Sequence, residues 1–308
     1  MASQQSLGDS ERNAVQRWAK RSIRNPKRVY RAMFYVAAIF FLFTTLFPFY
    51  WLIVLALTPN DLIINMGLVP RGANLEVFLT LFQRLPLHRY MLNSFIIAVI
   101  TTSIVLVLGS LAGYAFGRIE FRGRRPLMLV VLAVSYFPPA AFLLPLFRLF
   151  TGNISVFGVS SPVVFNTPAA LVTPMTALYM PLSVFILTTF YSQIPDGLED
   201  AARVEGMTRL GALFRVIMPL SAPGVATAGI MTFISVYNEF FFSFMMTDGQ
   251  VSNWAPVVFG ILGYQGQYSQ FYNLMAAASV IGVLPVVVLV VVAQERIVSG
   301  LTSGALKE

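Results

Sequence analysis

Few residues in this chain of 308 have side chains that carry out chemistry. Cysteine is absent and His88 is the single histidine, so a thiolate site, a histidine-based metal cluster or a catalytic triad has little to build from. The three lysines, Lys20, Lys27 and Lys307, are followed by Arg, Arg and Glu. A phosphate-binding P-loop needs Lys followed by Ser or Thr. We therefore expect a protein that is not itself an enzyme and holds no metal or cofactor.

Glu239 is the one ionisable residue deep inside an apolar stretch, and it follows Tyr237 and Asn238. A charged side chain in lipid is costly and marks a functional position by default. These three residues offer a ring, an amide and a carboxylate to a polar solute, but they could equally hydrogen-bond neighbouring helices. Together with Asn93 and Tyr136, they are our candidates for lining a pathway.

The segment 194–224 is polar, although apolar stretches flank it, and it contains four of the 13 acidic residues. We expect Asp196 to cap a short helix, with Glu199 completing a capping box. Gly206 suits the left-handed turn that ends such a helix, and Thr208 can cap a second one. The segment therefore predicts a surface element of two short helices.

Small residues in the first of these helices, Ala201 and Ala202, would let a partner approach its backbone closely. We interpret the element as a docking site for a soluble partner. The alternative is an amphipathic helix lying at the lipid interface. Its acidic residues outnumber its basic ones and would be repelled by anionic headgroups, which favours docking.

These residues must be positioned by a membrane-embedded framework. Hydrophobic residues make up 57% of the chain and charged residues 11%, against about a quarter charged in soluble domains. A spanning helix needs about 20 apolar residues, and backbone groups in lipid must bond within their own segment. We predict an all-α polytopic membrane protein with six transmembrane helices, at residues 33–57, 90–116, 126–147, 169–190, 220–246 and 271–294.

Basic residues are strongly biased to one side of this topology. Seventeen of the 21 Lys and Arg residues lie in the two tails and in the loops 117–125 and 191–219. Such loops are cytoplasmic, so both termini are expected there. The topology accounts for the net charge of +8 without nucleic acid, and the basic tail could also attract lipid headgroups. The predicted regions are a tail (1–32), a first helix (33–57), a five-helix core (90–294) and a second tail (295–308).

Three motifs resemble one family. The run D-A-A-x-x-x-G at 200–206, nine further residues and V-x-M-P ending at Pro219 resembles the EAA loop of type I ABC importer permeases, with Asp for Glu, Val for Ile and Met for Leu. The run Y-N-E-F at 237–240 resembles one common in carbohydrate importer permeases. The tail 296–307 is similar to that of maltose- and trehalose-type permeases of the G class.

The resemblance implies a type I permease fold in a bacterial or archaeal cytoplasmic membrane. It implies that the loop 195–219 docks on an ATPase subunit through Glu199, Asp200, Ala201, Ala202, Arg203, Glu205, Gly206 and Pro219. The implied partners are a homologous second permease, two copies of the ATPase and an extracytoplasmic solute-binding protein facing the loop 247–270. The substrate would be a sugar of the maltose or trehalose type, and ATP and Mg would bind to the ATPase.

Other interpretations are weaker. A secondary transporter or channel tends to place several ionisable groups or discontinuous helices at the membrane midplane; this chain offers Glu239 and a Pro138-Pro139 bend. That bend is either a gate or a tolerated kink. Gly109, Gly113 and Gly117 are spaced for close packing of helices.

Overall fold

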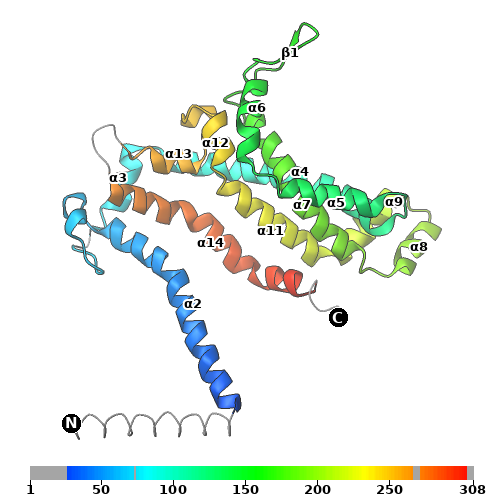
Figure 1. The fold of residues 1–308 in the computed structure, drawn as a ribbon, viewed down its shortest axis with the longest axis horizontal. Helices are drawn as coiled ribbons and strands as arrows, with labels where there is room; N and C mark the ends of the chain where they lie inside the picture. Colours follow the sequence, from blue (N-terminus) through cyan, green and yellow to red (C-terminus); the bar gives the residue numbers. More distant parts are fainter. Residues whose placement is uncertain (1–25, 73, 266–270, 304–308) are drawn as a thin grey trace, which may run out of the picture.

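The computed structural model describes residues 26–303, with gaps at residue 73 and at 266–270 (Figure 1). The tail predicted at 1–32 lies mostly outside the described residues, as do the last five residues of the tail predicted at 295–308. In chain order the elements are α2 (Pro26–Leu57), η1 (Asn60–Asn65), α3 (Val77–Arg84), α4 (Leu87–Arg118), α5 (Arg124–Ser135), α6 (Ala140–Phe150), β1 (Ser155–Val156), β2 (Val159–Ser160), α7 (Pro168–Tyr191), α8 (Asp196–Val204), α9 (Arg209–Ala212), η2 (Leu213–Ile217), α10 (Met218–Leu220), α11 (Ala222–Tyr237), α12 (Phe241–Met246), η3 (Val251–Asn253), α13 (Val257–Leu262) and α14 (Tyr272–Ser303).

The predicted helical membrane architecture is confirmed. Among the described residues, four helices are long and apolar enough to cross a membrane: α2, α4, α7 and α14. Two further pairs of helices pass the same test only together. The first pair, α5 and α6, is bent by 88°, and the segment 209–220 meets α11 at 85°. The described part of the chain therefore contains four spans, or up to six if each bent pair crosses the membrane once. The six spans predicted from the sequence equal this maximum.

The helix pair α4 and α7 forms the centre of the bundle, and glycines bring the two helices together. A Cβ atom added at Gly113 would lie 2.8 Å from the Leu187 Cβ atom, and one added at Gly117 would lie 3.2 Å from the Thr188 carbonyl oxygen. The first distance is shorter than Cβ contacts in proteins, and the second would require the neighbouring backbone to move by a few tenths of an ångström, so glycine is what permits this close approach. The packing role predicted for the spaced glycines is confirmed.

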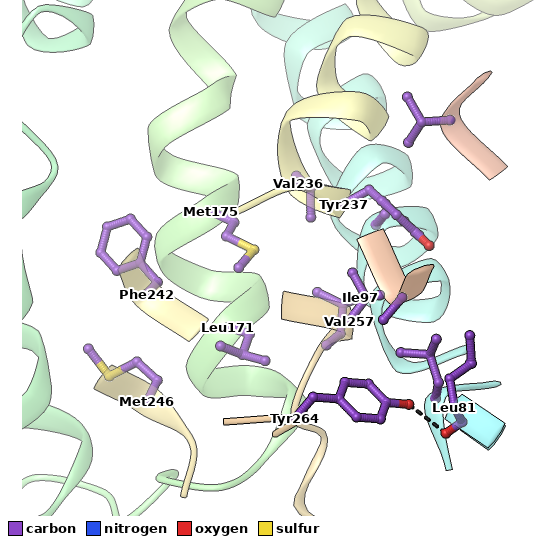
Figure 2. Packing of buried hydrophobic residues seen from close by; sticks show 14 of the residues in the cluster. Leu81, Ile97, Leu171, Met175, Val236, Tyr237, Phe242, Met246, Val257 and Tyr264 are labelled. Carbon is purple, nitrogen blue, oxygen red and sulfur yellow. Dashed lines mark hydrogen bonds between the residues drawn. The ribbon is translucent and has the colours of Figure 1, made fainter. Parts of the chain in front are cut away.

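The main apolar core lies where α4, α7, α11 and α12 meet (Figure 2). Leu171 and Met175 of α7 contribute to it, as does Phe242 of α12, and all three are almost fully buried. The Tyr264 hydroxyl donates to the Leu81 carbonyl oxygen at 2.6 Å, so the loop before α14 is tied to α3. This core holds the broken helices against the unbroken ones.

The predicted third span is interrupted at its proline pair. Helix α5 ends at Ser135 and α6 begins at Ala140. Pro138 and Pro139 have no N–H group to donate, and their rings clash with the preceding turn. The result is a change of direction of 88°, and the role of this bend as a gate or a tolerated kink stays a prediction.

The predicted fifth span, 220–246, is also two elements. Helix α11 stops at Tyr237, and the short α12 starts at Phe241. The expectation of one continuous helix here is wrong. The stretch is apolar throughout, and apolar composition alone does not show where a helix is interrupted.

Helix α2 diverges from the bundle. The C-terminal part of α2 contacts α14, whereas its N-terminal part lies apart from the other helices (Figure 1). Only 6% of its most apolar window is buried. Within the described residues the helix runs from Pro26, so it extends seven residues beyond the predicted start of the span at residue 33.

A small antiparallel hairpin, β1 and β2, stands out from the bundle beyond α6 (Figure 1). Its register pairs Ser155 with Ser160 and Val156 with Val159.

Gly113→Leu should destabilise the α4–α7 pair, because the added side chain meets Leu187 and the backbone of Thr188. Overpacking costs about 1–3 kcal/mol, and each kcal/mol lowers Tm by roughly 2–4 °C in a protein of this size class. The measurement is the Tm of the purified protein in detergent. Gly67→Leu is the control, since no heavy atom lies within 4 Å of its added Cβ. Equal Tm values for the two variants would contradict the close contact.

Candidate functional site

The polar segment forms the two short helices that the sequence predicts. Helix α8 ends in a turn where Gly206 adopts a φ of +92°, and the Met207 N–H donates to the Ala202 carbonyl oxygen at 3.1 Å. The Thr208 hydroxyl accepts from the Gly211 N–H at 3.1 Å and so begins α9. The second helix continues through a π-helical stretch, η2, into α10. The predicted roles of Gly206 and Thr208 are confirmed.

The predicted capping box of Asp196 and Glu199 is wrong. Pro195 precedes the first turn of α8, and no side chain caps it. Both carboxylates instead bind Arg118 at the end of α4: Asp196 at 2.8 Å, and Glu199 at 2.9 Å from Nε. A buried guanidinium is a stronger partner for these acids than the backbone N–H groups of their own helix.

Arg118 is the residue that sequence reasoning missed. Its side chain is only 4% exposed, and its Nη1 also donates to the Ile194 carbonyl oxygen at 2.5 Å. The hydroxyl of Tyr114, one turn earlier on α4, donates to the other carboxylate oxygen of Glu199. Removing one partner of a buried ion pair costs about 3–5 kcal/mol, so these contacts hold α8 firmly to α4. The i, i+4 spacing of Tyr114 and Arg118 at a helix end was the available signal.

The two alanines of the motif face opposite ways. Ala202 is 5% exposed and packs inward, whereas Ala201 is exposed. Val204 shares the exposed surface of α8 and is 88% exposed, and Leu198 is 45% exposed. The predicted positions that lie exposed are Asp200, Ala201, Arg203, Glu205, Gly206 and Pro219. Glu199 and Ala202 instead attach α8 to the bundle. The exposed apolar Val204 was not singled out from the sequence.

Glu239 caps α12. Its two carboxylate oxygens accept from the backbone N–H groups of Phe242 at 2.9 Å and Ser243 at 3.1 Å, and from the Ser243 hydroxyl at 3.1 Å. The residue is 6% exposed. A carboxylate at a helix N-terminus satisfies donors that otherwise lack partners. In this structure Glu239 therefore supports the break between α11 and α12.

The other candidate pathway residues are not brought together. Tyr237 is 1% exposed, and its hydroxyl donates to the Gly282 carbonyl oxygen at 2.9 Å. The Asn238 side chain donates to the Ile234 carbonyl oxygen at 2.9 Å within its own helix. Tyr136 is 88% exposed at the break between α5 and α6. The predicted pathway residues thus lie in separate places in the fold.

Asn93 lies in the first turns of α4 and binds a distant loop. Its Nδ2 donates to the carbonyl oxygens of Val251 at 2.9 Å and Ala255 at 3.0 Å. Ser94 beside it accepts from the Val257 N–H at 2.8 Å. Asn93 therefore organises the loop between α12 and α13.

Asp248 ties the same loop to the start of α7. It accepts from the side-chain amides of Asn166 at 3.0 Å and Asn253 at 2.7 Å. Burial opposes the ionised form, but hydrogen bonds from Gln250, Asn253 and Asn166 lower the pKa of Asp248. Because the folded-state pKa is depressed, this stabilisation is present above the ordinary aspartate range and is lost as the pH falls through the folded-state pKa.

A small apolar cavity of about 220 Å³ lies where the two broken spans meet α7. Phe137 comes from the α5–α6 break, Phe142 from α6 and Phe242 from α12. Pro174 and Pro181 come from α7. Its lining offers aromatic and aliphatic surface. In the part of the chain that the structure describes, no three His, Cys, Asp or Glu residues are placed to hold a metal ion.

Comparison with known proteins gives consistent matches. A profile of the family described as "binding-protein-dependent transport system inner membrane component" matches residues 105–300. The sulfoquinovosyl glycerol transport system permease protein of Agrobacterium fabrum is 36% identical, over 89% of this chain and 93% of that protein. The trehalose/maltose transport system permease protein of Thermococcus litoralis is also 36% identical, over 90% of this chain and 97% of that one.

A solved structure shares the fold. The chain resembles one from a bacterial ABC transporter involved in the import of the acidic polysaccharide alginate, with a TM-score of 0.68 and 16% identity. The match covers 87% of this chain and 96% of the other.

Gly206→Ala should loosen α8, because a non-glycine residue in the left-handed region costs roughly 1–2 kcal/mol. No heavy atom lies within 4 Å of the added Cβ, so the effect is purely conformational. Amide hydrogen exchange in α8 should speed up by roughly 5–30-fold. Gly197→Ala in the same helix also meets no atom within 4 Å, and because alanine is the better helix former it should slow exchange or leave it as it is. If both variants exchange alike, the Gly206 turn does not hold the helix.

Glu239→Leu should lower the Tm clearly more than Glu239→Gln. Leucine leaves the buried N–H groups of Phe242 and Ser243 without their acceptor, whereas glutamine keeps one carbonyl oxygen. Loss of a cap costs roughly 0.5–2 kcal/mol, and buried unpaired donors add to it. Equal losses would show that the negative charge matters more than the cap.

Proposed function

The chain belongs to the family of inner membrane components of binding-protein-dependent transport systems, and from that membership we propose that it is a permease subunit of an ATP-driven sugar importer. The observation that carries the proposal is 36% identity, over about nine tenths of both chains, to a permease of a trehalose/maltose transport system. The resemblance noted in the sequence is thereby confirmed.

Helix α8 is the proposed docking element for a cytoplasmic ATPase. It stands at one end of the bundle (Figure 1), and Ala201 and Val204 offer a small, apolar surface. Exposed Asp200, Arg203 and Glu205 surround that surface and would form a polar rim, as interfaces commonly have. Docking of the ATPase on this surface would cover the exposed apolar side chains of Leu198 and Val204.

The two broken spans are the proposed pathway side of the subunit. Irregular backbone at membrane depth is tolerated only where protein covers it or water fills a cavity. The break that ends at Ala140 and the break capped by Glu239 meet at the aromatic cavity of about 220 Å³. Tyr136, exposed at the first break, would face this pathway or the second permease.

The proposed substrate is an uncharged di- or oligosaccharide of the maltose or trehalose type. The predicted spans contain no Lys or Arg, so a sulfonate or phosphate group would find no cation within them. Although a permease for sulfoquinovosyl glycerol is as similar in sequence, the aromatic lining of the cavity between the broken spans suits a neutral sugar better.

The remaining features of the proposal concern assembly. The chain would pair with a homologous permease, two ATPase copies and a solute-binding protein that docks on the side opposite α8. ATP and Mg would bind to the ATPase subunits. The pair α5 and α6 would cross the membrane once, and so would α11, which gives six spans with both termini in the cytoplasm, as the distribution of basic residues supports.

The test is sugar-stimulated ATP hydrolysis and uptake by the complete complex in liposomes. Maltose or trehalose with the binding protein should stimulate hydrolysis. Val204→Asp should abolish both activities and release the ATPase, because a buried unpaired carboxylate is costly at an interface. Val159→Asp, at a 73% exposed valine on the hairpin, is the matched control and should retain the ATPase.

Two results would contradict the proposal. If Val204→Asp binds the ATPase like the parent, α8 is not the docking element. If uptake by the parent follows an ion gradient without ATP, the chain is a secondary transporter.

A further inference from the structure

Helix α4 is a continuous rod. Among the described helices of 18 residues or more, α2, α7 and α14 each contain a proline inside, and α4 does not. Its 32 residues correspond to roughly 48 Å at 1.5 Å per residue. A helix without a proline keeps all of its backbone N–H donors, and the turns of α4 that contain Gly109, Gly113 and Gly117 are packed against α7, which supports them against bending.

Side chains at one end of this rod hold α8. Arg118 binds the Asp196 and Glu199 carboxylates and the Ile194 carbonyl oxygen. Tyr114 binds Glu199 as well. Because these contacts reach the chain before α8 and both acidic residues of its first turn, α8 cannot rotate on α4 without breaking the buried ion pair with Glu199.

Side chains at the other end of the rod hold the loop 249–257. The Tyr90 hydroxyl donates to the Gly249 carbonyl oxygen at 3.1 Å. Asn93 binds the carbonyl oxygens of Val251 and Ala255, and Ser94 accepts from the Val257 N–H. Three residues in the first two turns thus fix the backbone along the loop, at the end of the bundle opposite α8 (Figure 1).

We propose that α4 is a rigid link between the two docking surfaces of the subunit, with Arg118 and Asn93 as the positioning residues at its ends. The inference rests on the proposed function, in which α8 meets the ATPase and the binding protein docks on the opposite side, where the loop 249–257 lies. A displacement of α8 on ATP binding then moves α4 as a body and shifts the loop. Linkage makes the effect reciprocal, so binding-protein contact at the loop biases α8.

The alternative route through α7 is less direct. Helix α7 packs closely on α4, but Pro174 and Pro181 lie inside it. The chain between α7 and α8 is short and carries Pro195 before the first turn of α8. Arg118 bypasses that connection with side-chain contacts to residues 194, 196 and 199.

The test uses a fluorescent reporter in the loop. The chain contains no cysteine, so Ser252→Cys, at an exposed position, gives this subunit a single thiol for an environment-sensitive dye. The complete complex is prepared with partner subunits that lack accessible cysteine. The measured quantity is the change in dye emission on adding a non-hydrolysable ATP analogue, together with ATPase retained on the complex.

In the parent complex the analogue should change the emission. Arg118→Ala and Asn93→Ala should each reduce that change by at least about 5-fold, the lower end of typical coupling between sites, while the ATPase stays bound. Arg122→Ala is the control, an exposed arginine just beyond the end of α4, and should respond like the parent. If Arg118→Ala fails to assemble, Tyr114→Phe removes only the hydroxyl bond to Glu199 and should reduce the change in the same direction.

Each remaining outcome is decisive. A full emission change in assembled Arg118→Ala, or in Tyr114→Phe together with Asn93→Ala, overturns the link through α4. A parent complex with sugar-stimulated hydrolysis but no emission change also overturns it and leaves the proposed function intact. A parent complex without sugar-stimulated hydrolysis contradicts the proposed function itself.

Discussion

The buried ion pair between Arg118 and Glu199 is the interaction on which the functional end of the molecule depends. A guanidinium that is 4% exposed must be fully paired, because an uncompensated buried charge costs several kcal/mol. Satisfying it requires α8 to turn Glu199 inward, and that orientation buries Ala202 and leaves Ala201 and Val204 exposed. The contact between Glu199 and Arg118 therefore determines which side chains of α8 form the proposed docking surface.

The membrane imposes the second constraint. Backbone groups left unbonded by a helix break must be covered or wetted, and the protein meets this need in two ways. Glu239 supplies acceptors for the N–H groups at the start of α12, and the break at Pro138-Pro139 uses residues that have no N–H group. Both breaks lie against α7, whose tight glycine-mediated contact with α4 provides an unbroken support. Rigid and broken helices thus have different tasks in the same bundle.

Local features were predictable from the sequence, and long-range ones were not. The turn at Gly206, the cap at Thr208 and the close approach at Gly113 depend on residue type and short spacing, and all are observed. The capping box failed because Arg118, 81 residues from Glu199, competed for the same carboxylate. The contact of Asn93 with Val251 spans 158 residues, so sequence alone suggested a pathway residue. The spaced glycines predicted the close packing of α4 on α7, but no comparable sequence pattern predicted the break between α11 and α12.

The most direct measurement is the structure of the complete complex, by electron cryo-microscopy, in nucleotide-free and ATP-bound states. Our account predicts that Ala201 and Val204 are buried against the ATPase in both states. It further predicts that the Arg118–Glu199 and Asn93–Val251 contacts persist while α4, α8 and the loop 249–257 move as one body. An α8 that stays free of the ATPase, or that shifts by breaking its contact with Arg118, would contradict the account.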